Sequence, residues 1–490
     1  MKIKIIKPIP FLASNTIIYS IGLFLANAIT FINYPILARG LSTNNFGIYD
    51  LFSSFAILLS ILMTFGIDSS VGRYFHEYDD NLKRNKVVFE GLVVQLAIII
   101  IVCSLFYSIA EKLISYVSED ENLVILLRLT IIQSAFQAIL NFTLSLLKWT
   151  FEKWKFIFLS IITSGLGLGL TSIAVYGFNA DLNVVFESIV VGRAISAVLA
   201  VYLIRNWLAD KKITFEYTLL LIRYSIPIGF ICVIEVIIPT FERNSILGIV
   251  NAEQLGLYAA AAKMVAILTV FVQGFQAAWG PLSLSIRNID KADEIYSLTA
   301  KVFVIAICLS VILITFSGKL FLGILLSQRY EDAYILIFPM SMSLAIQSTG
   351  LITGLGIYIS KSSYYQIVNY VVFAVSSIVL IITLTKIYGI VGTAIAVLLS
   401  SIIKTITSSI LGQYLYPIKW PIRVICLIFF ITTIIGIVLI FIQIHCEQWV
   451  SGIYTLITVI AMIYFFFFYS LSSDERVRFS EILRNATKFN

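Results

Sequence analysis

Cationic side chains lie deep inside several apolar segments of this sequence. Arg193, Arg243 and Lys263 each stand several residues from the nearest polar break. A charge at membrane depth is energetically costly and usually faces a partner or a water-filled cavity. At the rise of an α-helix, the three cations lie roughly 10–14 Å below the outer membrane surface. We therefore expect them to line a basic cleft for an anionic group, since the arginine fork binds two phosphate oxygens at once.

Acidic residues in the same region leave another interpretation open. Glu235 and Glu242 share a segment with Arg243, and Pro227 and Pro239 interrupt the backbone hydrogen bonding of that segment. Arg243 could pair with either carboxylate and hold helices together, or the cations could extend to lipid headgroups. In a basic cleft, Glu235 and Glu242 are the expected ion-coupling residues, because a bound proton or ion changes the attraction to nearby cations.

A polar stripe runs along the apolar segment near residue 133. Gln133, Gln137, Asn141 and Ser145 are spaced by four, which places them on one helical face. The stripe could supply interhelical hydrogen bonds, or it could form a cleft wall that binds sugar hydroxyls. We include Arg128, which lies in the same segment at shallower depth, among the candidate substrate-binding residues.

Two opposite charges mark the polar end of the second apolar segment. Asp68 and Arg73 lie in the stretch Gly66-Ile67-Asp68-Ser69-Ser70-Val71-Gly72-Arg73. They could form a helix-end ion pair or a helix cap. The alternative prediction is a gate contact between the two helix bundles.

The composition indicates that these apolar segments lie in a lipid bilayer. Of 490 residues, 59% are apolar and 12% charged, whereas soluble domains have about 45–50% apolar and about 25% charged residues. A soluble enzyme, a secreted disulfide scaffold and a disordered regulator are thereby excluded. The five cysteines are scattered singly and the two histidines lie far apart, so neither disulfide nor metal nor cofactor is expected.

The sequence predicts an all-α polytopic membrane protein with about fourteen transmembrane helices, because the apolar runs lack the two-residue alternation of barrel strands. Twelve spans remain possible if the apolar runs have been divided too finely, because two termini on the same side need an even number of spans. Of the basic residues, 22 fall in alternate loops and termini and only five in the opposite loops. This bias predicts that both termini lie in the cytoplasm. We expect the protein to lie in the inner (cytoplasmic) membrane of the cell. The predicted spans are 11–41, 46–72, 87–110, 123–147, 156–178, 184–206, 219–250, 255–281, 299–317, 335–357, 367–386, 390–412, 423–443 and 450–471.

Two short motifs recur in the same order and indicate an internal repeat. Phe46-Gly47-Ile48-Tyr49 is echoed by Leu255-Gly256-Leu257-Tyr258, and Val191-Gly192-Arg193-Ala194-Ile195 by Val391-Gly392-Thr393-Ala394-Ile395. Chance matching of common residues is the alternative. A repeat predicts two parallel six-helix bundles around a central cleft, as in alternating-access transporters. The expected domains are an N-lobe at 1–212, a C-lobe at 213–415, and two further helices with a cytoplasmic tail at 416–490.

Several of these segments resemble the polysaccharide flippases of the Wzx type, within the superfamily of multidrug and oligosaccharidyl-lipid exporters. The resemblance lies in Ala38-Arg39-Gly40-Leu41 with Phe46-Gly47-Ile48-Tyr49, in Gly66 to Phe75, and in Tyr258 to Lys263 with Phe275 to Pro281. It extends over about the first 420 residues. It implies movement of an undecaprenyl-pyrophosphate-linked oligosaccharide to the outer leaflet, coupled to a proton or sodium gradient. It also implies a basic cavity between two lobes.

Two other functions are weighed against the flippase. A multidrug or cation extruder would share the fold but should have an acidic or aromatic cleft. A membrane glycan polymerase or ligase generally needs a large outer loop with catalytic residues, and none is predicted here. No enzyme activity is expected. The expected partners are the lipid-linked oligosaccharide, H⁺ or Na⁺, membrane lipids and a polysaccharide polymerase complex, but no nucleic acid.

Overall fold

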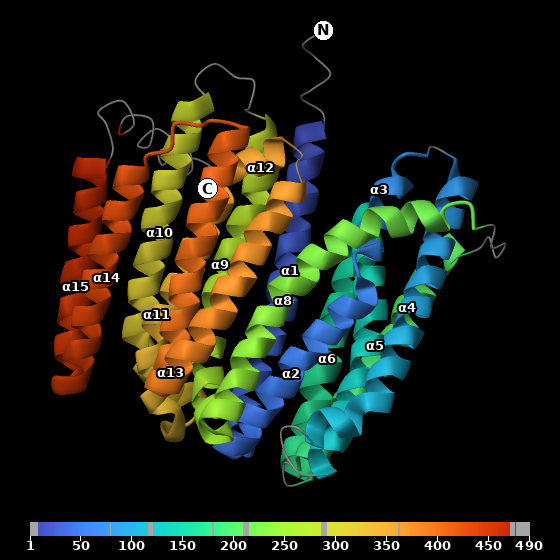
Figure 1. Ribbon diagram of the computed structural model, residues 1–490, viewed down its shortest axis with the longest axis horizontal. Coiled ribbons are helices and arrows are strands. Elements are labelled where there is room, and N and C mark those ends of the chain that lie inside the picture. The colour runs from blue at the N-terminus through green and yellow to red at the C-terminus, as the bar shows by residue number, and fades with distance from the viewer. Residues whose placement is uncertain are drawn as a thin grey trace. The chain divides into compact units, whose positions relative to one another are not determined.

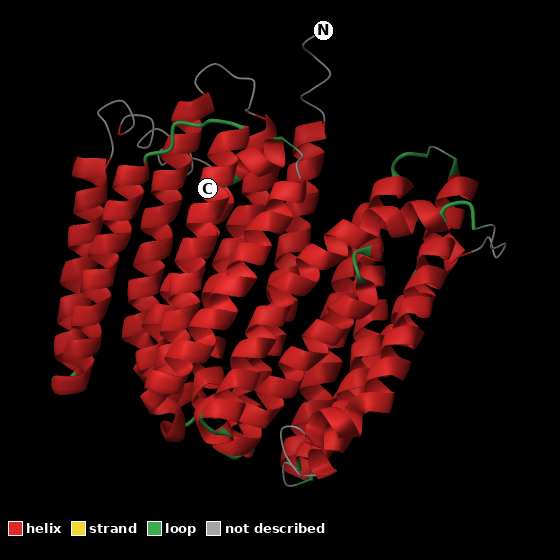
Figure 2. Ribbon diagram, in the orientation of Figure 1, coloured by secondary structure: helices red, strands yellow, loops and turns green. Residues whose placement is uncertain are grey.

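The apolar segments form long helices, because backbone polar groups in lipid must find partners within the chain. The computed structural model describes residues 8–78, 80–115, 121–178, 181–208, 215–285, 292–360, 363–470 and 476. Within these ranges every regular element is helical (Figure 2). Twelve described helices are long and apolar enough to cross a membrane. The prediction of an all-α polytopic membrane protein is therefore confirmed.

The described chain divides into two compact units, residues 1–259 and 260–490. The predicted lobe boundary at residue 212 belongs to the repeat hypothesis and stays a prediction. Helices of the first unit (Figure 1) are α1(Pro8–Gly40), α2(Thr43–Thr64), α3(Ile67–Phe75), α4(Asn81–Ser115), α5(Glu121–Trp149), α6(Lys153–Gly177), α7(Leu182–Leu203), α8(Thr218–Ile249) and the start of α9(Ala252–Ser285). The second unit holds the rest of α9 and then α10(Ala292–Phe321), α11(Tyr334–Thr353), α12(Leu355–Ile359), α13(Ser363–Leu415), α14(Ile422–His445) and α15(Gln448–Phe465).

Helix α13 comprises two antiparallel helices joined at Gly389. This glycine has φ 59° and ψ −140°, which are not helical values. The hydroxyl oxygens of Thr385 and Thr393 lie 2.8 Å apart, whereas residues eight apart in one helix are separated by about 12 Å. The chain therefore reverses at Gly389. Counting α13 as two segments raises the described candidate spans to thirteen. The first predicted span coincides with α1, a helix of 33 residues.

The second predicted span is interrupted between α2 and α3. Phe65 and Gly66 both adopt left-handed backbone conformations, with φ values of 42° and 74°. The interruption leaves carbonyl groups of α2 without helical partners, and Gln95 of α4 donates a hydrogen bond to one of them, the carbonyl of Met63, at 2.8 Å. The new helix start places Asp68 in the first turn of α3, where a carboxylate is favoured by the helix dipole.

An apolar core fills one end of the first unit. Ile67 and Val71 of α3 pack there with Val87, Phe142 and Phe156 from the neighbouring helices. At the same end, Glu90 of α4 accepts hydrogen bonds from the Tyr217 backbone and the Thr218 hydroxyl, at 2.9 and 3.0 Å. This carboxylate caps the first turn of α8 and attaches α8 to α4 within the first unit.

In the second unit, α11 packs against the later part of α13 through small and hydroxyl-bearing residues. The Ser343 and Ser401 hydroxyls lie 2.7 Å apart, and those of Thr353 and Ser409 lie 2.6 Å apart. A side chain on Gly356 would overlap the backbone of Gly412. Small residues allow this close approach, which is how helices associate in lipid.

Candidate functional site

The first unit contains a polar cavity of about 400 Å³ among α1, α2, α5, α6 and α7. This volume is in the range of small-molecule sites. Its polar walls are built from every helix of that set. The lining residues that matter for chemistry are Asn33, Tyr34, Tyr49, Gln133, Gln137, Asn141, Thr163, Thr171 and Arg193.

Arg193 is the positive charge of this cavity. It projects from the middle of α7, where its neighbour Gly192 is buried against Leu170 of α6. Among the described residues, Arg193 has no ion-pair partner and no hydrogen-bond partner. A guanidinium in this position keeps five N–H donors for a ligand. The cavity thus combines a positive charge with free donors at membrane depth.

Unpartnered oxygen atoms complement this cation. Asn33 Oδ1, Gln137 Oε1, Thr163 Oγ1 and Thr171 Oγ1 are buried and accept no hydrogen bond from other described residues. All four residues line the cavity. Buried polar groups in proteins are nearly always hydrogen-bonded, so these atoms indicate a place for water or a polar ligand.

The structure brings most of the predicted polar stripe to this cavity. Gln133, Gln137 and Asn141 line it together with Arg193. Gln137 donates to Asn141 Oδ1 at 2.7 Å, a bond within α5 itself. Ser145, the last member, instead donates to Asp68 at 2.8 Å. The stripe is therefore cavity wall for three of its residues and a helix-to-helix contact for the fourth.

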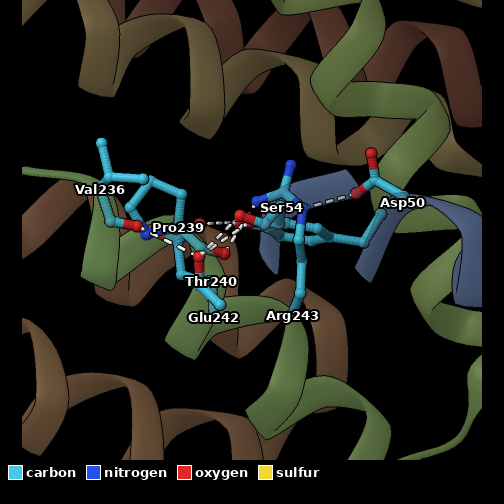
Figure 3. A network of polar contacts seen from close by, with 8 residues as sticks. Asp50, Ser54, Val236, Pro239, Thr240, Glu242 and Arg243 are labelled. Atoms are coloured by element: carbon cyan, nitrogen blue, oxygen red, sulfur yellow. Dashed lines mark hydrogen bonds and ion pairs between the residues drawn. The ribbon is translucent and has the colours of Figure 1, made fainter. Parts of the chain in front are cut away.

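Arg243 belongs to a buried network beside this cavity (Figure 3). Its Nε donates to Asp50 Oδ2 of α2 at 2.5 Å, and its Nη1 donates to the Pro239 carbonyl at 2.9 Å. The Asp50 side chain is 1% exposed and that of Arg243 is 13% exposed. Glu242 accepts a hydrogen bond from the Tyr258 hydroxyl at 2.8 Å. The Asp50–Arg243 pair joins α8 to α2. The hydrogen bond from Tyr258 to Glu242 attaches the start of α9 to α8.

Backbones come into close contact next to this network. A side chain on Gly47 of α2 would overlap the Ala252 carbonyl of α9, and one on Gly256 would overlap the Thr43 carbonyl. The two glycines thus let the first turns of α2 and α9 touch directly. They occupy equivalent positions in the two copies of the sequence motif.

Other predicted residues lie elsewhere. Arg128 pairs with Glu111 of α4 at 2.6 Å and does not line the cavity. Glu235 is exposed on α8 between its two prolines. Lys263 falls in the second unit, so its predicted convergence with Arg193 and Arg243 stays a prediction.

Asp68 and Arg73 contact different helices. Asp68 accepts the hydrogen bond from Ser145 of α5. Arg73 lies 4.7 Å from the ring centroid of Tyr224 on α8, donates to the Tyr224 hydroxyl at 3.4 Å, and pairs with Glu77 at 3.6 Å. Together they connect α3 to α5 and α8, and their role as a gate stays a prediction.

A family model described as "Polysaccharide biosynthesis protein" matches residues 12–287, more than half of the chain. The chain belongs to this family. The matched range includes every residue of the cavity and of the buried network described above. The resemblance drawn from the sequence motifs is therefore confirmed at the level of family.

A relative is similar to this member of the polysaccharide biosynthesis family in sequence, and solved structures are similar to it in fold. An uncharacterized membrane protein of Haemophilus influenzae is 24% identical over 349 residues, covering 68% of this chain and 81% of that protein. The structure of lipid II flippase MurJ in an inward closed conformation superimposes with a TM-score of 0.72 at 14% identity, covering 92% of this chain and 99% of that one. An inward-facing multidrug resistance MATE transporter of the MOP superfamily gives 0.66 at 14% identity, covering 80% and 93%. The family member therefore has the fold of flippases and multidrug exporters.

Sequence reasoning missed Asp50 and Tyr258, the partners of Arg243 and Glu242. A signal for Asp50 was present, because it is the one carboxylate of α2. It lies seven residues after the start of α2, and Arg243 lies six residues before the end of α8. On antiparallel helices these positions share a depth of roughly 10 Å. A search for opposite charges at the same depth on neighbouring helices would therefore have found the Asp50–Arg243 pair from the sequence.

Proposed function

We propose that the protein is a flippase for a polyprenyl-pyrophosphate-linked oligosaccharide. In this proposal it moves the repeat unit from the cytoplasmic to the outer leaflet by alternating access, for surface polysaccharide biosynthesis. Membership of the polysaccharide biosynthesis family and the flippase and exporter fold both support this function. The lipid-linked cargo is what the resemblance to polysaccharide flippases implies, and the chemistry of the site supports an anionic cargo that carries sugar hydroxyls.

The observation that carries the proposal is Arg193, which lines a polar cavity and has no ion-pair partner among the described residues. Its guanidinium suits a phosphate group, because two N–H donors can engage two oxygens of one phosphate. Gln133, Gln137 and Asn141 offer amide donors and acceptors at the same cavity, which suits sugar hydroxyls. A cationic drug would instead meet a positive charge here, which disfavours the extruder alternative.

Ion coupling is part of the proposal. Glu242, buried with Tyr258 and next to Arg243, and Glu235 on the same helix are the carboxylates proposed to take H⁺ or Na⁺. Binding of a proton or ion there would change the attraction between Glu242 and Arg243. Such coupling requires that cargo and ion bind the inward and outward states with different affinities.

The remaining proposals concern location and chemistry. The bias of basic loops supports a position in the cytoplasmic membrane with both termini in the cytoplasm. We propose that the protein performs no covalent chemistry and delivers its cargo to a separate polysaccharide polymerase. Lys263 and Arg128 are proposed to attract the anionic cargo as further basic residues of the transport pathway.

Complementation of a strain that lacks its own flippase tests the proposal. Arg193→Ala should abolish surface polysaccharide, and Arg193→Lys should retain part of it because the charge survives without the fork. Losing charge-assisted hydrogen bonds of about 1.5–3 kcal/mol weakens cargo binding roughly tenfold to 100-fold. Arg205→Ala is the matched control, since Arg205 follows the same helix and packs over Tyr202 outside the cavity.

Expression and membrane insertion are measured in parallel by immunoblotting. In reconstituted liposomes, the wild type should move intact lipid-linked oligosaccharide to the opposite leaflet. Cleaved or extended glycan would instead support an enzyme. Wild-type efflux of cationic dyes with no flipping would support the extruder. Normal complementation by Arg193→Ala contradicts the proposed site.

A further inference from the structure

A second polar cavity lies in the second unit, at one end of α10, α14 and α15. It has a volume of about 250 Å³. Lys319 comes from the last turn of α10, Gln443 from the last turn of α14, and Glu331 from the short 3-10 helix Gln328–Ala333. Helices α14 and α15 both pack against α10 (Figure 1). No residue of the first unit lines this cavity, so it is separate from the Arg193 site.

The cavity presents opposite charges that form no ion pair with each other. Lys319 and Glu331 both line it, yet neither has an ion-pair partner among the described residues. Lys319 Nζ lies 5.2 Å from the ring centroid of Tyr334, and a Cβ on Gly323 would lie only 2.6 Å from Glu331 Oε1. The ammonium and the carboxylate are thus held apart on the walls of one small cavity.

A buried amide adds an unused acceptor. Gln443 is 7% exposed, and its Nε2 donates to the Thr315 and Phe316 carbonyls at 3.3 and 3.1 Å. These two carbonyls fix the amide orientation, and Gln443 Oε1 accepts no hydrogen bond from the described residues. The cavity therefore offers a cation for a phosphate, and a carboxylate with a neutral acceptor for an ammonium group.

The surroundings indicate how such a ligand would reach the cavity. Leu320 and Ile324 line it and are 44% and 57% exposed. Trp449, 65% exposed at the start of α15, donates to Glu447 at 2.7 Å. Exposed apolar side chains next to a hydrogen-bonded tryptophan are typical of the interface between acyl chains and water. The cavity lies at headgroup level, with apolar surface available for lipid tails.

We infer that this cavity binds the headgroup of a zwitterionic phospholipid that carries a phosphate and a primary amine. The phosphate binds Lys319, the ammonium group binds Glu331 and Gln443 Oε1, and the acyl chains lie on the exposed apolar residues. The bound lipid fastens the α14–α15 pair to α10 at the membrane surface. This site does not depend on the proposed transport function.

Native mass spectrometry of the full-length protein with defined lipids tests the inference. The wild type should retain one phosphatidylethanolamine about tenfold more strongly than phosphatidylglycerol, the effect of one charge-assisted hydrogen bond. Glu331→Gln should remove this preference while phosphatidylglycerol binding persists, and Lys319→Met should weaken both lipids. Asp332→Asn and Lys386→Met are matched controls, since both side chains are exposed and neither lines the cavity.

The difference between the two variants makes the test independent of misfolding, because a misfolded protein would lose both lipids equally in either variant. Equal retention of phosphatidylethanolamine, phosphatidylglycerol and diacylglycerol by the wild type would overturn the inference. So would an unchanged preference in Glu331→Gln. Displacement of the lipid by equimolar soluble phosphoethanolamine would overturn the assignment to a lipid and identify a site for the free headgroup.

Discussion

The buried pair Asp50–Arg243 should contribute far more to stability than the exposed pair Arg128–Glu111. Both pairs have nitrogen-to-oxygen distances near 2.5 Å, at 2.5 and 2.6 Å, so geometry does not separate them. Exposure does. The Asp50 and Arg243 side chains are 1% and 13% exposed, whereas those of Glu111 and Arg128 are 76% and 35% exposed. The two pairs therefore form a matched comparison within one protein.

Removing one partner of the buried pair leaves the other charge without its nearest opposite charge in a dry environment. Asp50→Asn and Arg243→Gln should each lower the free energy of unfolding by about 3–5 kcal/mol. The double variant removes both charges together and should recover part of this loss, which gives a coupling energy of about 2–3 kcal/mol. The Glu111→Gln and Arg128→Gln cycle should give a coupling energy below about 1 kcal/mol, because water screens that pair.

Unfolding of the purified protein in mixed micelles, followed by tryptophan fluorescence during titration with a denaturing detergent, measures both cycles. Equal unfolding midpoints for Asp50→Asn and Glu111→Gln would refute the reasoning. A coupling energy near zero for Asp50 and Arg243 would do so as well. Flipping by the double variant is a separate readout. If its stability is recovered but transport is not, the charges also act in transport.

Two further predictions follow from backbone contact and loop charge. Gly47→Ala and Gly256→Ala should each lower the free energy of unfolding by about 1–3 kcal/mol, because each new Cβ would overlap a carbonyl of the facing helix. The control is Gly248→Ala, since nothing lies within 4 Å of a Cβ at that position. Equal unfolding midpoints in the three variants would contradict the predicted overlap. In a cysteine-free variant, a membrane-impermeant maleimide applied from outside should label a cysteine at position 44 and leave positions 80, 212 and 480 unmodified, and external labelling at 480 would contradict the inside–inside topology.

The hydrophobic pattern predicted the helices well because lipid leaves so few alternatives for an apolar backbone. It could not predict where a span breaks. The interruption at Phe65 and Gly66 places a non-glycine residue at φ 42°, a conformation that sequence rules assign to glycine. Packing determines it: a Cβ on Gly229 of α8 would lie 2.8 Å from the Phe65 carbonyl. Contacts between distant segments of this kind are not visible in local composition.

The candidate site could be predicted in part. Helical spacing placed Gln133, Gln137 and Asn141 on one face, and they line the same cavity as Arg193. Depth alone grouped Arg193 with Arg243, and their surroundings differ: Arg193 faces a cavity, while Arg243 is paired with Asp50. Depth fixes one coordinate of a side chain. The direction in which the side chain faces around the helix axis depends on which helices are its neighbours. The sequence pattern did not specify those neighbours.

The recurring motif gives the clearest relation between sequence and site. Its glycines, Gly47 and Gly256, lie where the starts of α2 and α9 touch, and neither position has room for a side chain. The tyrosines of the motif make different contacts. Tyr49 lines the Arg193 cavity, and the Tyr258 hydroxyl donates a hydrogen bond to Glu242. Asp50, directly after Tyr49, binds Arg243. One close backbone contact therefore positions a wall of the proposed cargo site and the proposed coupling carboxylate together. A change that separated α2 from α9 at this contact would disturb both sites at once, which is the physical requirement for coupling cargo to an ion.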